Sequence, residues 1–231
     1  MNNSPLYFTS NPLRYAIGKQ SYISMAKKAV NISISHESLH QEDISIRHYH
    51  ATVPTFLFAL DGELSLKHQF KDVLLKKNQG CWLPCDNTTT TTLLSPTVKI
   101  AVLQFPAIRK PAKQTTQFTN RYYDAVIPNT SKSGVTTWSI YQAKNGIISI
   151  ILYPAHYKET PYYYKNTNQF LLSLVGEFAL SINKQPFSIC PKTGKFLPKT
   201  TRKALFNYNN DSIYVVNVIT PYPIKDRVFA L

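Results

Sequence analysis

The sequence contains an internal repeat. Residues 55–66 (TFLFALDGELSL) are matched downstream by residues 169–180 (QFLLSLVGEFAL). Three residue pairs keep the same spacing of 114 positions without a gap: Gly62 and Gly176, Gly80 and Gly194, and Pro84 and Pro198. Each copy has the pattern of a β-hairpin, with an apolar strand, a turn at Gly-Glu and a second strand. A duplication of this kind predicts two equivalent all-β units in one chain.

Apolar segments separated by turns continue on both sides of each repeat. We expect strands at 29–35, 73–75 and 98–105 in the first half, and at 146–152, 187–190 and 213–219 in the second, with Gly-x3-Pro segments at 80–84 and 194–198. Short strands with frequent turns predict a jelly roll or a related closed β-barrel in each half. The expected organisation is an N-terminal arm at 1–28, an N-terminal barrel at 29–108, a linker at 109–135 and a C-terminal barrel at 136–231.

The composition is that of an ordered globular protein with a basic surface. Hydrophobic residues make up 43% of the chain and charged residues 16%, while the formal net charge is +14. Basic side chains are spread along the sequence in groups such as Lys27-Lys28 and Arg109-Lys110, with no run of five. A solvated basic surface is therefore favoured over a nucleic-acid partner, for which no motif is present.

Cysteine usage and the N-terminus indicate the compartment. Three cysteines, Cys81, Cys85 and Cys190, make no even disulfide framework and have no zinc-finger spacing. The chain starts without a basic and apolar leader and has no apolar stretch long enough to span a membrane. We expect a soluble, cytoplasmic protein, and edge pairing through residues 1–28 is compatible with a homodimer.

The spacing of polar residues around the first repeat resembles a known family. His48-x-His50, four residues, Thr55, six residues and Gly62, followed by Gly80-x3-Pro84, are similar to the two motifs of the cupin superfamily. Two such units resemble a bicupin. In catalytic cupins two histidines, a glutamate and a later histidine bind one divalent metal inside the barrel. Alternate residues of a strand share a face, so His48 and His50 are expected to enter the same lumen.

This resemblance assigns a partial ligand set to the N-terminal barrel. His48 and His50 are the metal candidates, Thr55 stands in place of the glutamate, and Thr89 or a neighbour stands in place of the last histidine. Imidazole ligands suit Fe, Mn, Ni or Zn, and two of them with water would bind weakly. The alternative is that both imidazoles are satisfied by hydrogen bonds within a polar lumen.

In the C-terminal barrel the same positions carry no metal ligand set. Tyr162 and Tyr164 replace the histidines, Gln169 replaces the glutamate and Lys203 replaces the final histidine. Phenol, amide and ammonium groups are hydrogen-bond donors, so this set suits a small anionic or polyhydroxylated ligand.

Three functions are compatible with these residues. The first is a bicupin that binds a small polar or anionic ligand in its barrels, with at most a weak metal at His48 and His50. The second is a metal-dependent enzyme, a dioxygenase or isomerase, that works in the N-terminal barrel. The third is a scaffold whose basic surface contacts a partner. A fold hosts many functions, so the sequence leaves open whether the protein is an enzyme.

Overall fold

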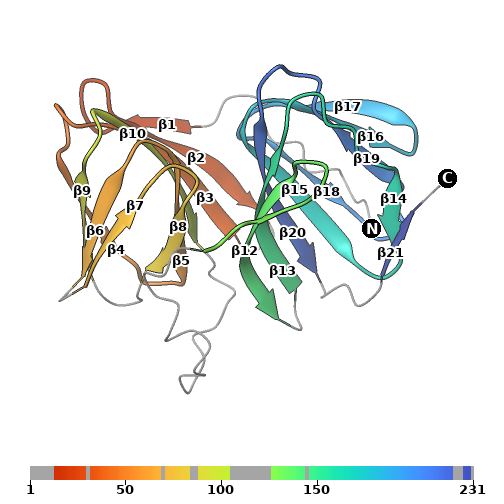
Figure 1. The fold of residues 1–231 in the computed structure, drawn as a ribbon, viewed down its shortest axis with the longest axis horizontal. Coiled ribbons are helices and arrows are strands. Elements are labelled where there is room, and N and C mark those ends of the chain that lie inside the picture. Colours follow the sequence, from red (N-terminus) through yellow and green to blue (C-terminus); the bar gives the residue numbers. More distant parts are fainter. Residues whose placement is uncertain are drawn as a thin grey trace. The chain divides into compact units, whose positions relative to one another are not determined.

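The computed structural model describes residues 13–29, 32–68, 71–83, 88–104, 126–143, 146–220 and 226–229. These residues divide into two compact units between Ile127 and Pro128. Within the described ranges the chain forms strands and no helix (Figure 1), so the predicted all-β class is confirmed. Accordingly, no membrane-spanning helix is found in this part of the chain.

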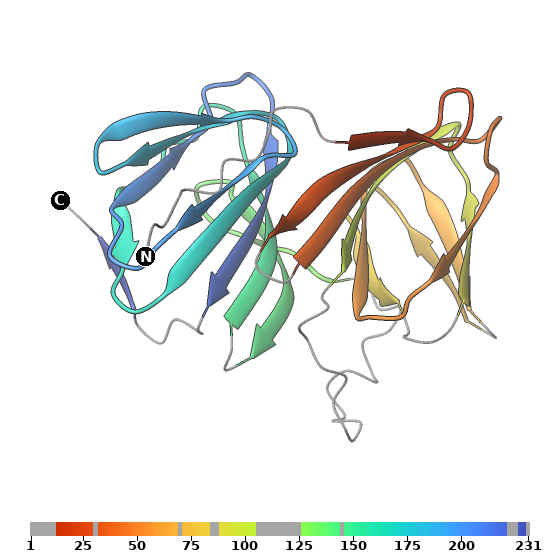
Figure 2. The same cartoon turned by 180° about the vertical axis from the view of Figure 1, so that it is seen from behind.

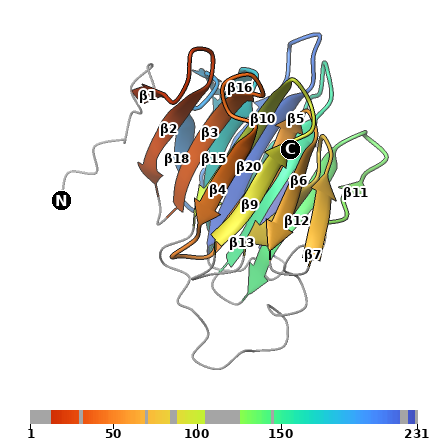
Figure 3. The ribbon, with the colours of Figure 1, turned by 90° about the vertical axis from the view of Figure 1, so that its left-hand side faces the viewer.

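The N-terminal unit consists of two antiparallel sheets. The larger sheet has the order β1 (Leu13–Ala16), β2 (Tyr22–Ala29), β3 (Ile32–His40), β10 (Thr97–Gln104), β5 (Thr55–Asp61) and β8 (Gly80–Leu83). The smaller sheet has the order β4 (Ile46–His50), β9 (Thr88–Leu93), β6 (Leu64–His68) and β7 (Lys71–Leu75). Figure 3 shows these four strands side by side in one layer.

The C-terminal unit is built in the same way, and Figure 2 shows it from behind. Its larger sheet has the order β11 (Asn129–Thr130), β12 (Thr136–Ala143), β13 (Gly146–Tyr153), β20 (Ile213–Thr220), β15 (Asn168–Val175) and β18 (Gly194–Leu197). The second sheet has the order β17 (Gln185–Ile189), β16 (Phe178–Ile182), β19 (Lys203–Phe206), β14 (Tyr162–Tyr164) and β21 (Arg227–Phe229).

The two units share one topology. Strands β1, β2, β3, β10, β5 and β8 of the first unit follow the same order as β11, β12, β13, β20, β15 and β18 of the second. The smaller sheets correspond as well, and among the described strands only the C-terminal unit has a fifth strand, β21, at the edge of this sheet. This agreement supports the duplication inferred from the sequence.

The repeated Gly-Glu turn connects two sheets and does not close a hairpin. β5 pairs with β10 and β8, whereas β6, which follows Gly62, pairs with β9 and β7. The expected hairpin is therefore wrong, although both strands and the turn lie where the sequence placed them. Gly62 and Gly176 have φ of 77° and 81°, a conformation that favours glycine.

Gly176→Ala tests how tightly this turn is packed. A Cβ at Gly176 would lie 2.5 Å from Ile213 Cγ2, whereas one at Gly134, with a similar φ of 79°, would lie 3.5 Å from Pro154. We expect Gly134→Ala to cost about 1 kcal/mol of unfolding free energy from backbone strain, and Gly176→Ala about 2 kcal/mol because crowding adds to it. Urea unfolding of both variants measures the difference. Equal losses would contradict the packing argument.

Part of the segment expected to be an N-terminal arm belongs to the larger sheet. Residues 13–29 form β1 and β2, and β2 pairs antiparallel with β3. Within the expected linker, Asn129–Thr130 form β11, which pairs with β12. Residues 105–125 lie outside the described part, and the domain boundaries given above remain a prediction.

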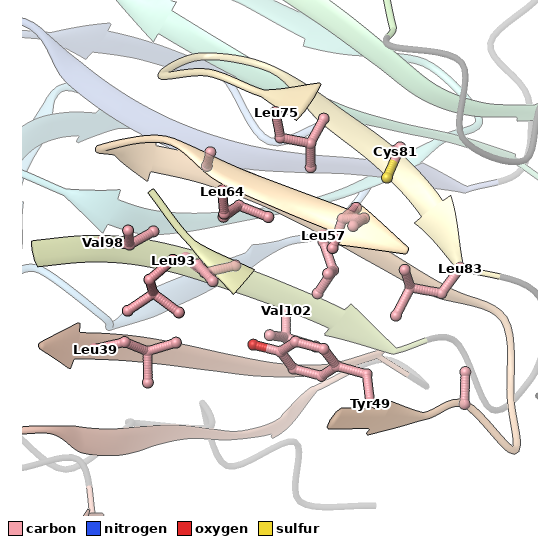
Figure 4. Close-up of a cluster of buried hydrophobic side chains, with 14 residues drawn as sticks. Leu39, Tyr49, Leu57, Leu64, Leu75, Cys81, Leu83, Leu93, Val98 and Val102 are labelled. Carbon is pink, nitrogen blue, oxygen red and sulfur yellow. The ribbon is translucent and has the colours of Figure 1, made fainter. Parts of the chain in front are cut away.

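Each unit has its own apolar core between its two sheets. In the N-terminal unit the core includes Leu39, Leu57, Leu64, Leu93 and Val102, and Figure 4 shows these side chains converging from both sheets. The C-terminal unit has a corresponding cluster that includes Leu171, Phe178, Leu197, Leu205 and Val215. Cys81 is a free buried thiol of the N-terminal core, and burial raises the pKa of this thiol to about 12.

Candidate functional site

The histidine pair of the N-terminal barrel lies on the outer face of β4. Along this strand Tyr49 is buried, whereas His48 and His50 are exposed. Nδ1 of His48 lies 3.3 Å from Oγ1 of Thr90, and Nδ1 of His50 lies 3.4 Å from Oγ1 of Thr88. The expectation that both imidazoles enter the barrel is wrong, because the side chain of Tyr49 faces the interior and those of His48 and His50 face outward.

A buried ion pair occupies the barrel interior at this level. Glu37, on β3, has a side chain 4% exposed and accepts hydrogen bonds from Nε and Nη2 of Arg47, each at 3.2 Å. The Tyr49 hydroxyl donates to Oε2 of Glu37 at 2.7 Å. Burial and then the charge of Glu37 raise the pKa of Tyr49 well above its ordinary value, so this phenol remains a neutral donor. We refer to Glu37, Arg47 and Tyr49 as the inner triad.

Thr55 and Thr89 are buried, at 2% and 0% exposure. Oγ1 of Thr55 donates to the carbonyl oxygen of Val53 at 2.8 Å. Thr89, on β9, is the strand partner of Tyr49. Thr89 therefore lies beside the inner triad, whereas Thr55 lies on β5, and the ligand-binding role of both remains a prediction.

The interior of the N-terminal barrel does not fit a divalent metal. Its carboxylate, Glu37, is already paired with the cation of Arg47 and with Tyr49. Among the residues that the structure describes, no three His, Cys, Asp or Glu side chains form a group that could hold a metal ion. The guanidinium of Arg47 beside this carboxylate repels a divalent cation.

The four predicted positions of the C-terminal barrel lie together. Tyr162 and Tyr164 are 3% and 6% exposed, and their rings meet edge to face with centroids 5.5 Å apart. Lys203, the first residue of β19, is the strand partner of Tyr162. Gln169, on β15, accepts a hydrogen bond from the Tyr162 hydroxyl at 3.3 Å. Residues from two sheets therefore meet at one place inside this barrel.

Lys203 brings a buried amine to this cluster. The residue is 2% exposed, and its Nζ has no hydrogen-bonding partner among the described residues. This nitrogen lies 5.0 Å from the ring centroid of Tyr162 and 4.7 Å from that of Tyr164. Burial lowers the pKa of Lys203 to about 8; the charge of Glu159 opposes this shift and that of Arg227 adds to it.

Arg227 and Glu159 complete the cluster, and the sequence analysis did not find them. Cζ of Arg227 lies 3.7 Å from the Tyr162 ring centroid, and its Nη2 donates to Oε1 of Glu159 at 3.0 Å. Oε2 of Glu159 accepts from the backbone N–H of Leu205 at 3.1 Å. Burial raises the pKa of Glu159, and the Arg227 charge opposes the shift. We refer to Lys203, Arg227, Glu159, Tyr162 and Tyr164 as the lysine site.

A row of polar side chains leads from the lysine site across the larger sheet. Nε2 of Gln169 donates to Oδ1 of Asn217 at 2.7 Å, and Nδ2 of Asn217 lies 3.4 Å from Oγ of Ser149 as donor. All three residues are buried. Burial raises the pKa of Tyr162 well above its ordinary value, so its hydroxyl remains the donor to Gln169. The amide of Gln169 is thereby fixed in orientation.

Solved structures with a similar fold are cupin proteins. The chain is similar to AerE from Microcystis aeruginosa, with a TM-score of 0.65 and 12% identity over 93% of this chain and 98% of that one. It is also similar to a cupin 2 conserved barrel domain protein from Leptotrichia buccalis, with a TM-score of 0.53 and 10% identity over 89% and 91%. A third similar structure is oxalate decarboxylase from Bacillus subtilis, a protein with Mn(II) centres, with a TM-score of 0.63 and 8% identity over 99% and 80%.

No family model and no curated protein matches the chain by sequence. The structural similarity establishes the fold alone: each unit is a jelly-roll barrel similar to those of these cupin proteins, as the motif spacing predicted.

Proposed function

We propose that the C-terminal barrel binds a small organic anion, a monocarboxylate, at the lysine site. The observation that supports this most is the Lys203 amine, which is buried, lies against two aromatic rings and has no hydrogen-bonding partner among the described residues. A buried polar group without a partner is costly, and an anion whose oxygens accept hydrogen bonds from this amine removes the cost.

The charges of the site favour a single negative charge. Lys203 and Arg227 are cations, and Glu159 is the carboxylate whose charge acts on both. Both oxygens of Glu159 are engaged, by Arg227 and by the backbone of Leu205. The carboxylate of Asp226 is not counted in this site, because it accepts hydrogen bonds from Asn166 and Thr167. One positive charge is left for a ligand, and the rings of Tyr162 and Tyr164 favour an organic body.

The interior of the N-terminal barrel supports this choice of barrel. Glu37 and Arg47, the charged pair described inside it, offset each other. The proposal therefore depends on the predicted ligand-binding roles of Tyr162, Tyr164, Gln169 and Lys203. The predicted roles of Thr55 and Thr89 in the other barrel have less support.

The experiment is a ligand screen by thermal unfolding at constant ionic strength. We expect monocarboxylates such as lactate to stabilise the protein by about 2.7 kcal/mol at about 100 times Kd, and inorganic phosphate and chloride to have little effect. Lys203→Met should weaken binding by roughly tenfold to a hundredfold, the worth of a charged hydrogen bond. Lys199→Met is the matched control, because it removes the same charge from an exposed position. Equal losses in both variants would contradict the proposal.

A weak divalent metal at His48 and His50 is the second proposal. Both imidazoles stand on the exposed face of β4, on the same side of the strand. With two imidazoles and water as ligands we expect weak, reversible binding of Zn²⁺ or Ni²⁺ that His48→Ala removes and His156→Ala, at another exposed histidine, does not. Calorimetric titration measures this. Stoichiometric metal that survives desalting and is lost in His48→Ala would instead support the metal-dependent enzyme.

A further inference from the structure

We propose that Lys203 forms an imine with the carbonyl group of a 2-oxo monocarboxylate bound at the lysine site. This proposal rests on the anion-binding function given above and names the chemical class of the ligand. It adds a covalent step that binding alone does not require.

The surroundings of the Lys203 nitrogen are those of a nucleophilic amine. An amine attacks a carbonyl only in its neutral form, which a water-excluded site next to another cation favours. Nζ is enclosed by the faces of Tyr162 and Tyr164 and has no hydrogen-bonding partner among the described residues. The guanidinium of Arg227 stacks on the same Tyr162 ring and is the neighbouring cation. A pKa of about 8 leaves about a tenth of the amine neutral at pH 7, which agrees with this geometry.

Arg227 determines which carbonyl compound fits. Its side chain is 40% exposed, and Nη2 donates to Glu159, whereas a guanidinium carries five N–H donors. A carboxylate is the anion that matches these donors. Cζ of Arg227 and Nζ of Lys203 lie 3.7 Å and 5.0 Å from the ring centroid of Tyr162, so one small ligand can reach both cations. In the proposed arrangement the carboxylate meets Arg227 and the atom next to it faces Lys203. In a 2-oxo acid that adjacent atom is the carbonyl carbon.

The step balances without an oxidant or a reductant. The nitrogen lone pair of neutral Lys203 forms a bond to the carbonyl carbon, and the carbonyl oxygen takes up a proton to give a carbinolamine. The hydroxyl then takes a second proton and leaves as water, while the nitrogen loses one proton and becomes the protonated imine. The net change is one amine, one carbonyl group and one proton converted to an iminium and one water.

The experiment traps the imine with cyanoborohydride. The full-length protein is incubated with pyruvate and the reductant over hours, because the amine is buried, and the adduct is located by peptide mass spectrometry. We expect the reduced adduct on Lys203 to exceed that on exposed Lys199 by about tenfold or more. Lys203→Arg, which keeps the charge but forms no imine, should show no adduct at this position and should still bind pyruvate.

Lactate separates this proposal from the proposed function. It has the same carboxylate and nearly the same size, but a hydroxyl in place of the carbonyl, so it tests binding without imine formation. If pyruvate and lactate both stabilise the wild-type protein through Lys203 and no adduct forms there, the imine is wrong and anion binding stands. An adduct no greater on Lys203 than on Lys199 overturns the imine whatever the binding result, and the absence of stabilisation by either acid overturns both.

Discussion

Replacing Glu37 by leucine is expected to lower the unfolding free energy of the N-terminal barrel by about 3 kcal/mol. The substitution leaves the cation of Arg47 and the hydroxyl of Tyr49 inside the barrel without their common acceptor. Breaking a buried ion pair by removing one partner typically costs about 3–5 kcal/mol. The Arg47 side chain is 28% exposed, so water reaches it in part and the lower end of this range applies.

The control replaces the whole inner triad. We expect Glu37→Leu combined with Arg47→Met and Tyr49→Phe to recover stability to within about 1 kcal/mol of wild type, since apolar groups of similar size leave no orphaned polar atom. The chain has two tryptophans, and Trp82 lies in the N-terminal unit. Urea unfolding followed by Trp82 fluorescence in a Trp138→Phe background therefore reports this barrel alone. A loss below about 1 kcal/mol for Glu37→Leu would mean that the pair is effectively solvated.

The inner triad also explains why the sequence-based metal prediction placed His48 and His50 inside the barrel incorrectly. A His-x-His pattern shows that two imidazoles share a face of β4, but it does not show which face. Arg47 and Tyr49 alternate with the histidines, and a buried aromatic ring with a carboxylate partner is the more favourable interior set. The partner that decides the phase, Glu37, lies on another strand, so the local sequence could not reveal it.

The duplication made two features of the topology predictable: the presence of two equivalent units and the turn at each repeated glycine. Gly62 and Gly176 have the positive φ that their position in the repeat requires. The repeat could not show which strands pair. The two strands that flank each glycine belong to different sheets. The choice between a hairpin and a crossing to the facing sheet depends on contacts with β10 and β20, which lie far away in the sequence. β21, which pairs with β14, has no counterpart among the described strands of the N-terminal unit and was not expected.

The same limit applies to the lysine site. Tyr162, Tyr164, Gln169 and Lys203 were brought together correctly because motif spacing places them on strands that face one lumen. Arg227 and Glu159 come from a three-residue edge strand and from a loop, where no periodicity is long enough to assign a face. Arg227 is placed by the pairing of β21 with β14, and Glu159 by its hydrogen bonds with Leu205 of β19.

Burial of the Lys203 charge predicts a pH dependence of stability for the C-terminal barrel. The folded pKa is about 8, below the ordinary 10.5, so between these values the unfolded chain binds more protons and stability rises with pH. Below pH 8 both states are protonated and the full cost of burying the charge is present. We expect the stability of wild type relative to Lys203→Met to rise by about 3 kcal/mol between pH 8 and pH 10.5.

At neutral pH the cost of burying the Lys203 charge is present in the wild-type protein and absent in Lys203→Met. We therefore expect the variant to be more stable than wild type without ligand. A pKa of about 8 in place of 10.5 corresponds to a net cost of about 3 kcal/mol for the charged amine in the folded state, so we expect a gain of up to about 3 kcal/mol. Burial raises the pKa of both tyrosines, which therefore stay neutral over most of this range. Trp138 fluorescence in a Trp82→Phe background measures the C-terminal barrel, and Lys199→Met corrects for the change in net charge. A flat difference between pH 8 and pH 10.5 would mean that the Lys203 charge is not desolvated, and the anion-binding proposal would then lose its main support.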